Sequence, residues 1–188
     1  MKWLLCITFM GICLDIFPQK SELFKKHNPA LNLYLSPFFN RDINPDSNSL
    51  INPATNWNIN PVETIECNPS KNEKINPLLN LLYNPQQNEV LNPLYIKNLW
   101  PDDLSWDGQY IFDEHNELKG YVSRASQEVI LCFNSNMEWD GYFVKASEKL
   151  FNHFSITGLW TGKFLCTDNN GGYNLFNRDC KWTHQYIK

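Results

Sequence analysis

The sequence predicts a mainly β protein, an Asn/Pro-cornered repeat solenoid followed by a four-hairpin antiparallel β domain. Two internal repeats support this prediction: one has a period of eight residues and the other a period of about 21 residues. Repeats of short period are typical of architectures in which each unit packs on its neighbours. The expected divisions are a signal peptide or apolar segment over 1–22, the octapeptide repeats over 28–101 and the hairpin repeats over 102–188.

The octad repeat places a proline at every eighth position from Pro29 to Pro101, and an asparagine at nearly every fourth position. Proline at this interval excludes an α-helix and a flat sheet, because each proline lacks a backbone N–H donor. Asparagine before proline can cap a turn with its side chain. We therefore expect short extended steps joined by Asn-Pro corners, with an apolar residue before most corners. The asparagine and isoleucine positions that define the solenoid are Asn44, Asn52, Asn60, Asn68, Asn76, Asn84, Ile43, Ile51, Ile59 and Ile75.

Stacking of the coils would bring asparagine over asparagine and isoleucine over isoleucine, which forms amide ladders and an apolar spine. The spacing allows eight or sixteen residues per coil, and we favour sixteen because isoleucine barely fits inside the thinner rod. The alternative is a disordered Asn/Pro-rich linker. The unbroken phase and the regular isoleucine row favour the solenoid, in which the remaining octad positions, such as Trp57, are expected to tolerate substitution.

The hairpin repeat follows Trp100. Each unit has a phenylalanine, a leucine or tryptophan six residues later, and usually a glycine eight residues later. Two short apolar runs around a polar patch are a β-hairpin signal. A loop of three or five residues would pair the phenylalanine with the leucine or tryptophan on one face. Four such hairpins predict a closed or nearly closed ring, or a β-meander. The phenylalanines and their expected partners are Phe112, Phe133, Phe154, Phe176, Leu118, Trp139, Trp160 and Trp182.

The units have Y-x-x-F-[DN]-x-[ND] and W-x-G-[YF] character, which resembles the four-fold β-flower type of bacterial hairpin-repeat domain. The octads ahead of them are similar to tracts in long bacterial repeat proteins, so the resemblance covers residues 28–188. It implies an architecture and no established activity. The fourth unit departs by carrying His184 in place of glycine, which indicates a chain end or an interface. The hairpins are also similar to the choline-binding hairpins of cell-wall proteins, which build aromatic cages between units.

Two roles are open to the hairpin aromatics. They could stack against a sugar or a choline group, or they could form the core of a small domain that has little else to bury. We favour the core. The candidate ligand-stacking or core aromatics are Trp139, Trp160, Trp182, Phe143, Phe164 and Tyr186.

The sequence predicts no enzyme, no catalytic residue, no metal site and no cofactor. Its four histidines lie far apart, and no metalloprotease, nucleophile-elbow or phosphate-loop motif is present. Acidic pairs such as Asp113–Glu114 fall in expected turns, where aspartate is common, although a calcium ion there is an alternative. The four cysteines beyond the leader lack zinc-site spacing. We expect them to be unpaired, partly buried thiols, with extracellular disulfides as the alternative.

The N-terminus carries one lysine before an apolar run from Trp3 to Leu14, which suits a signal peptide and is too short to span a bilayer. A buried strand or helix is the alternative, because no small-residue cleavage site is visible. Contact with a membrane is therefore expected only through this leader, if it is not cleaved. The net charge of −4 gives no reason to expect a nucleic-acid partner.

These features predict a non-enzymatic secreted or surface structural repeat protein, located outside the cell or on its surface. In this prediction the solenoid is a stiff spacer and the hairpin domain is its head. Exposed sheet edges at the ends of the solenoid leave open self-association into a homo-oligomer or a fibre. The alternative function is a carbohydrate- or cell-wall-binding module that uses the hairpin aromatics to hold a glycan.

Overall fold

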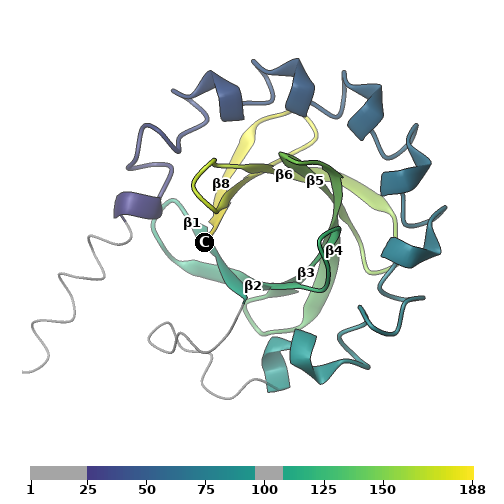
Figure 1. Ribbon diagram of the computed structural model, residues 1–188. Helices are drawn as coiled ribbons and strands as arrows, with labels where there is room; N and C mark the ends of the chain where they lie inside the picture. Colours follow the sequence, from purple (N-terminus) through teal and green to yellow (C-terminus); the bar gives the residue numbers. More distant parts are fainter. Residues whose placement is uncertain (1–24, 96–107) are drawn as a thin grey trace, which may run out of the picture.

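The computed structural model describes residues 25–95 and 108–188 of the chain. The second range forms a closed barrel of eight antiparallel strands, and the first range, here called the belt, runs around its outside (Figure 1). The expected mainly β fold is thus confirmed. The strands are β1 (Gln109–Asp113), β2 (Leu118–Arg124), β3 (Val129–Asn134), β4 (Trp139–Ser147), β5 (Leu150–Phe154), β6 (Trp160–Thr167), β7 (Tyr173–Phe176) and β8 (Trp182–Ile187).

The belt has no strand among its described residues and instead carries short 3-10 helices separated by turns. The predicted leader over 1–22 lies outside the described residues. So does most of the stretch 100–108 (WPDDLSWDG), whose tryptophans and glycine repeat the hairpin spacing of six and eight residues and predict a truncated transition hairpin. The 3-10 helices are η1 (Arg41–Ile43), η2 (Ser49–Ile51), η3 (Trp57–Ile59), η4 (Ile65–Cys67), η5 (Glu73–Ile75), η6 (Glu89–Leu91) and η7 (Pro93–Tyr95).

The four predicted hairpins are confirmed as β1–β2, β3–β4, β5–β6 and β7–β8. Their turns share one pattern of hydrogen bonds. In the first turn, the Asp113 N–H donates to the Glu117 carbonyl at 3.0 Å, and the Asn116 N–H donates to the Asp113 carbonyl at 2.9 Å. The last residue of each three-residue loop has a left-handed backbone, as such loops usually require. These four residues are Asn116 (φ 64°), Met137 (64°), Gly158 (82°) and Cys180 (60°).

The strand register confirms the predicted aromatic pairs. Phe112 is opposite Leu118, and the other three phenylalanines are opposite Trp139, Trp160 and Trp182. Three of the four phenylalanines are also buried as expected, whereas Phe112 is half-buried. The buried three belong to two apolar clusters that include belt residues, so they lie on the outer face of the barrel.

Pairing between β1 and β8 closes the ring. The closure explains why the fourth repeat departs from the others, because the His184 Nδ1 lies 2.7 Å from the Glu114 Oε2 of the first hairpin turn. His184 has a left-handed backbone like the glycine of the third repeat, with φ of 62° against 81° for Gly162. The expected interface is therefore the contact between the last hairpin and the first. The side chains clustered inside the barrel are Ile111, Val122, Ile130, Cys132, Phe143, Phe151, Leu165, Leu175 and Ile187.

One stripe of belt residues covers the outer face of the barrel. The residue before the Asn-Pro or Ser-Pro pair, at every eighth position from Leu35 to Ile75, is at most 7% exposed. Ile51 and Ile59 pack in one cluster with barrel residues such as Phe164, and Ile75 packs in another. Burying one such side chain stabilises a fold by about 1.5–3 kcal/mol. The stripe therefore attaches the belt along most of its length.

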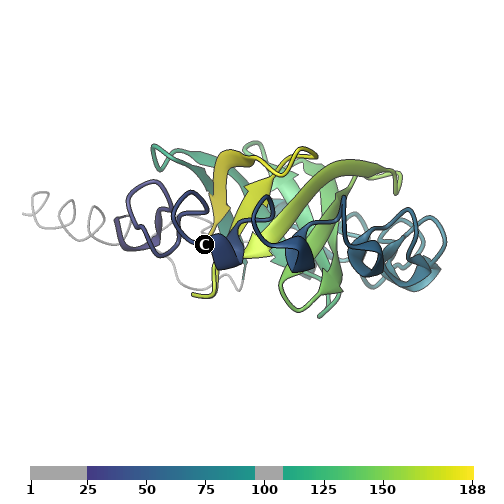
Figure 2. The ribbon, with the colours of Figure 1, turned by 90° about the horizontal axis from the view of Figure 1, so that it is seen from above.

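The structure does not show a stacked solenoid. Figure 2 shows the belt as a single band around the barrel, in which successive octads follow one another instead of stacking as sixteen-residue coils. The physical reason is that a period of eight provides one apolar stripe. A solenoid would need that stripe inside its own coil, whereas here the stripe points out of the coil towards the apolar barrel. The hairpin domain is therefore not a separate head on a spacer.

The belt asparagines bind backbone groups, as expected, but they join turns and not extended steps. Asn52 Oδ1 accepts from the Ala54 N–H at 2.9 Å, and its Nδ2 donates to the Pro45 carbonyl at 3.0 Å. Asn88, whose half-octad has no proline, similarly donates to the Leu82 carbonyl at 2.9 Å. The asparagines themselves are extended, whereas the residues between them form hydrogen-bonded turns.

Polar side chains of the barrel bind the belt backbone beside the apolar stripe. Buried carbonyl groups are costly without a donor, and the belt has no ladder partner to supply one. The barrel provides donors to the carbonyl of the stripe residue in three octads. These bonds run from Asn174 Nδ2 to the Leu35 carbonyl at 3.0 Å, from Cys166 Sγ to the Ile51 carbonyl at 3.9 Å, and from Asn152 Nδ2 to the Ile59 carbonyl at 2.7 Å.

Substitution of Ile59 by aspartate is expected to destabilise the protein strongly, by about 3–5 kcal/mol. The reason is that it places an unpaired carboxylate in the apolar contact between belt and barrel, here called the seam. Trp57→Ser is the matched control: Trp57 lies in the same turn and is 77% exposed, whereas Ile59 is 3% exposed. The control should change the free energy of unfolding by about 0.5 kcal/mol or less. Urea denaturation of both variants measures the difference. Equal losses of stability in the two variants would contradict the burial of the stripe against the barrel.

Candidate functional site

The structure does not bring the six candidate aromatics together at one site. Phe143 lies inside the barrel, while Phe164 stacks on Phe176 on the outer face, with ring centroids 5.6 Å apart. Tyr186 donates from its hydroxyl to Asn116 Oδ1 at 2.8 Å, near the closure of the barrel. Most of these rings therefore serve packing within the barrel and the seam.

Trp160 differs from the tryptophans at the equivalent repeat positions. The indole N–H of Trp139 donates to the Gly141 carbonyl at 2.8 Å, and that of Trp182 donates to the Gln185 carbonyl at 2.9 Å. The indole N–H of Trp160 is shielded from solvent and has no hydrogen-bond partner among the described residues. An unpaired buried donor costs about 1–3 kcal/mol, so this position marks a place where the regular packing is interrupted.

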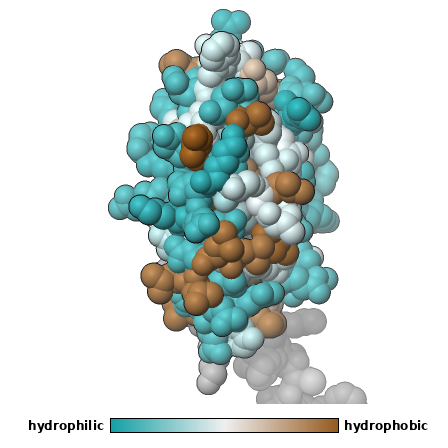
Figure 3. Space-filling view, turned by 90° about the vertical axis from the view of Figure 1, so that its right-hand side faces the viewer, coloured by the Kyte–Doolittle hydropathy of each residue, from teal (hydrophilic) through white to brown (hydrophobic). Residues whose placement is uncertain are grey.

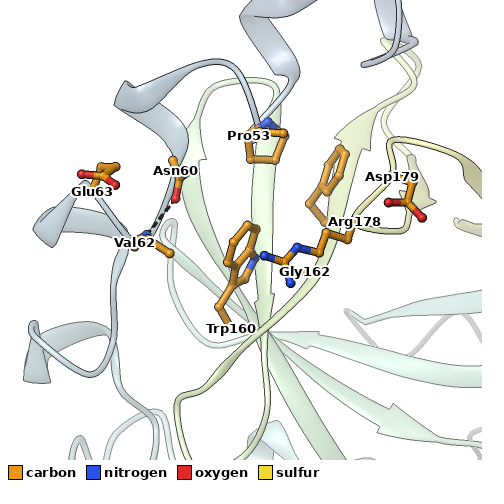
Figure 4. Close-up of a pocket in the computed structure, with 10 residues that line it drawn as sticks. Pro53, Asn60, Val62, Glu63, Trp160, Gly162, Arg178 and Asp179 are labelled. Carbon is orange, nitrogen blue, oxygen red and sulfur yellow. Dashed lines mark hydrogen bonds between the residues drawn. The ribbon is translucent and has the colours of Figure 1, made fainter.

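Trp160 lines a cavity of about 350 Å³ between the belt and the barrel, here called the seam pocket. Figure 4 shows that the belt contributes one wall of the pocket and that Trp160 and Arg178 come from the barrel on the other side. The volume suits a ligand of about one sugar ring, at the lower end of the usual range of ligand cavities. The residues that define the pocket here are Pro53, Asn60, Glu63, Trp160, Arg178 and Asp179.

Arg178 is held over the Trp160 ring without an ion pair. Its guanidinium carbon is 5.8 Å from the ring centroid, which is within the range of a cation–π contact. Gly162 makes this position possible, since a Cβ there would lie 3.0–3.2 Å from the arginine stem. Among the described residues, Arg178 has no hydrogen bond or salt bridge to a side chain. Its charge is therefore free to meet a ligand.

The belt supplies a third uncommitted donor at Asn60. Its Oδ1 accepts from the Val62 N–H at 2.9 Å, as Figure 4 shows. In several octads the amide nitrogen at this position donates to the proline carbonyl seven residues earlier, for example from Asn68 to Pro61 at 2.7 Å. In the described belt, Asn44, Asn60 and Asn84 lack this bond. Of these three, Asn60 lines the seam pocket together with Pro53.

Arg178 is not among the residues predicted from the sequence, and the role predicted for Asn60 is structural only. A signal for Arg178 was present, because it occupies the first position of a hairpin turn where the other three units have Glu114, Ser135 and Ile156. No sequence signal shows that this turn lies beside the belt. Asn60 is indistinguishable by pattern from the other belt asparagines, and its different bonding appears only in the structure.

The outer surface of the belt is a second candidate functional surface. The octad positions that face away from the barrel hold many exposed apolar side chains, and Figure 3 shows apolar patches on one side of the molecule. One patch, here called the leucine patch, consists of Leu78, Leu79, Leu81 and Leu82, which are 38–73% exposed. A second patch, here called the aromatic patch, consists of Leu31, Leu33, Tyr34 and Phe39, which are 57–85% exposed.

The barrel also holds a buried histidine with altered acid–base behaviour. His153 is 7% exposed, its Nδ1 lies 2.9 Å from the Thr161 hydroxyl, and its ring packs on Phe143. Burial, with a smaller contribution from the charge of Lys163, lowers the pKa of His153 to about 4. The histidine is thus neutral at physiological pH, where it acts as a hydrogen-bonded part of the barrel.

The four cysteines of the described residues are free and buried, as expected for unpaired thiols. Burial raises the pKa of Cys67 to about 11 and that of Cys132 to about 12, so these thiols resist ionisation. Within 25–95 and 108–188, no group of three histidine, cysteine or acidic residues could hold a metal ion. No helix of the part of the chain that the structure describes is long and apolar enough to cross a membrane.

Comparison with protein families, with curated proteins and with solved structures finds no match to this chain. The resemblance to β-flower hairpin repeats and to bacterial Asn-Pro repeat tracts therefore rests on its sequence motifs alone. The structure supports its coarser part, a closed antiparallel barrel of eight strands built from hairpins.

The buried histidine predicts a specific dependence of stability on pH. Because the pKa of His153 falls from 6.5 to about 4 on folding, the unfolded chain binds a proton between these values that the folded chain does not. Stability is therefore expected to fall as the pH is lowered from 6.5 towards 4, by up to about 3 kcal/mol from this residue. Urea denaturation at pH 7 and pH 4.5 measures the change. His153→Gln should reduce the dependence, and an unchanged dependence would contradict the assignment.

Proposed function

We propose that this protein is a non-enzymatic structural subunit that associates with further copies of itself through the outer surface of the belt. The observation that carries the proposal is the exposure of the leucine patch and the aromatic patch. Soluble monomers rarely expose large contiguous apolar patches, and those that do generally use them for binding. A spacer role is not retained, because the stripe of the belt is buried against the barrel.

The partner proposed for each patch is the other patch on a second copy. The segments that hold the patches lie on opposite sides of the barrel, near the two ends of the belt (Figure 1). A contact between two different surfaces of identical subunits propagates into a ring or a filament. The closed barrel offers no free strand edge, so assembly would use side chains of the belt and not added strands. Secretion remains a prediction from residues 1–22, outside the described range.

The combined substitution Leu78→Gln, Leu79→Gln and Leu81→Glu tests this proposal. It copies the residues at the same positions of the next octad, Gln86, Gln87 and Glu89, so the belt should remain folded. Burial of one leucine is worth about 1.5–3 kcal/mol, and the variant should weaken association at least about tenfold.

Analytical ultracentrifugation over a concentration series measures this association. Gln86→Ala with Gln87→Ala is the control, and it should leave association unchanged because it alters the same octad positions outside the leucine patch. A wild-type chain that stays at 22.1 kDa at its highest soluble concentration would contradict the proposal.

A second candidate function is carbohydrate binding in the seam pocket, and the Trp160 ring in the pocket lining favours it. Sugars commonly bind by stacking on an aromatic ring, with nearby polar groups that orient their hydroxyls. In the seam pocket, Trp160 supplies the ring, Asn60 and Arg178 supply donors, and Glu63 and Asp179 supply acceptors.

Trp160→Phe is expected to weaken binding of a monosaccharide about fivefold, because phenylalanine offers a smaller ring for stacking. Isothermal titration calorimetry with D-glucose and D-glucuronate measures this. Trp139→Phe is the matched control, since it makes the same change of ring at the equivalent repeat position. Equal losses in both variants, or no binding of either sugar, would contradict this function.

A further inference from the structure

We propose that the seam pocket recognises the carboxylate of an acidic sugar, with Arg178 as the counter-ion of that carboxylate. This inference rests on the second candidate function and narrows it to one class of ligand, a uronic acid or a sugar of similar charge. It gives the charge of Arg178 a role beyond the hydrogen bonds that a neutral sugar would accept from it.

The uncommitted groups around the Trp160 ring are donors. The Asn60 amide nitrogen lacks the bond to a proline carbonyl that several other octads have, and the guanidinium has no ion pair among the described residues. Donors without acceptors favour a ligand group that only accepts hydrogen bonds. A carboxylate is such a group, and it matches the planar fork of a guanidinium with two parallel hydrogen bonds.

Two neighbours, Gly162 and the Trp160 ring, restrict the position of the Arg178 side chain. The stem of the side chain lies against Gly162, and the guanidinium lies over the indole ring. A guanidinium held in this way loses less side-chain entropy when it binds a planar anion. Gly162 has φ of 81°, a conformation that favours glycine, so the space under the arginine is part of the hairpin geometry.

The two acidic residues of the pocket lie at its edges. Figure 4 shows Glu63 on the belt side and Asp179 on the barrel side, with Trp160 and Arg178 between them. Both residues are exposed, so water screens their repulsion of a bound anion. The carboxylates of Glu63 and Asp179 can accept hydrogen bonds from the hydroxyl groups of a sugar. A simple organic acid such as acetate has no hydroxyl group to donate. The arrangement therefore suits an acidic sugar better than a simple organic acid.

The test compares three probes on the full chain by isothermal titration calorimetry: D-glucuronate, D-glucose and acetate. D-Glucuronate and D-glucose differ by the carboxylate, and acetate carries the carboxylate without the ring. We expect D-glucuronate to bind at least about tenfold more tightly than D-glucose, as a charge-assisted hydrogen-bond pair would give. Acetate should show no saturable binding over the same concentrations.

Arg178→Gln should remove the preference for D-glucuronate, so that the variant binds D-glucuronate and D-glucose with equal affinity. Arg41→Gln is the control, because it makes the same change of net charge at an exposed belt position away from the pocket. Arg178→Lys, which keeps the charge without the planar fork, should retain part of the preference.

Each unfavourable outcome has a distinct meaning. Equal affinities of the wild-type chain for D-glucuronate and D-glucose would overturn the inference while leaving the second candidate function intact. Binding of acetate as tight as that of D-glucuronate would overturn the sugar part of the inference. An equal loss in Arg41→Gln and Arg178→Gln would show a general charge effect and overturn the role of Arg178. Absence of binding by any probe would overturn both proposals together.

Discussion

The fold depends on one contact, the burial of the apolar stripe of the belt against the outer face of the barrel. The stripe residues recur every eight positions and are almost inaccessible to solvent, and they share clusters with outward-facing barrel aromatics. Without the belt, rings such as Phe133 and Phe154 would lie on an exposed apolar surface. Without the barrel, the stripe would have no partner. The belt and the outer face of the barrel therefore each supply the apolar surface that the other needs.

Hydrogen bonding follows from this contact. A belt without strands has no ladder to satisfy its backbone, so asparagine side chains join successive turns, and barrel residues such as Asn152 and Asn174 reach the carbonyls of the stripe. The eight-residue interval between Asn-Pro pairs is thus a solution to two requirements. It turns the same face to the barrel once per octad, and it provides a capping side chain at every turn.

The candidate binding functions arise where this regularity is broken or left unused. In the seam pocket, Asn60 lacks a bond that several other octads make, Trp160 lacks the acceptor that its repeat equivalents have, and Arg178 replaces the Glu114, Ser135 and Ile156 of the other turns. On the outer surface of the belt, the octad geometry constrains no side chain, so apolar residues there are free to serve association. A repeat scaffold can thus carry specific chemistry in its few departures from symmetry.

Sequence alone predicts the two repeats, the four hairpins, the aromatic pairs across them and the capping role of asparagine, because these depend on contacts within about 20 residues of chain. The wrapping of the belt around the barrel is visible only in the tertiary structure. A single apolar stripe at a period of eight requires one partner surface, and nothing in its spacing distinguishes the next coil from a domain that begins after Trp100. The seam pocket could not be predicted from the sequence for a similar reason. Asn60 and Arg178 are more than 100 residues apart, and they line one cavity only because the barrel closes and the belt encircles it.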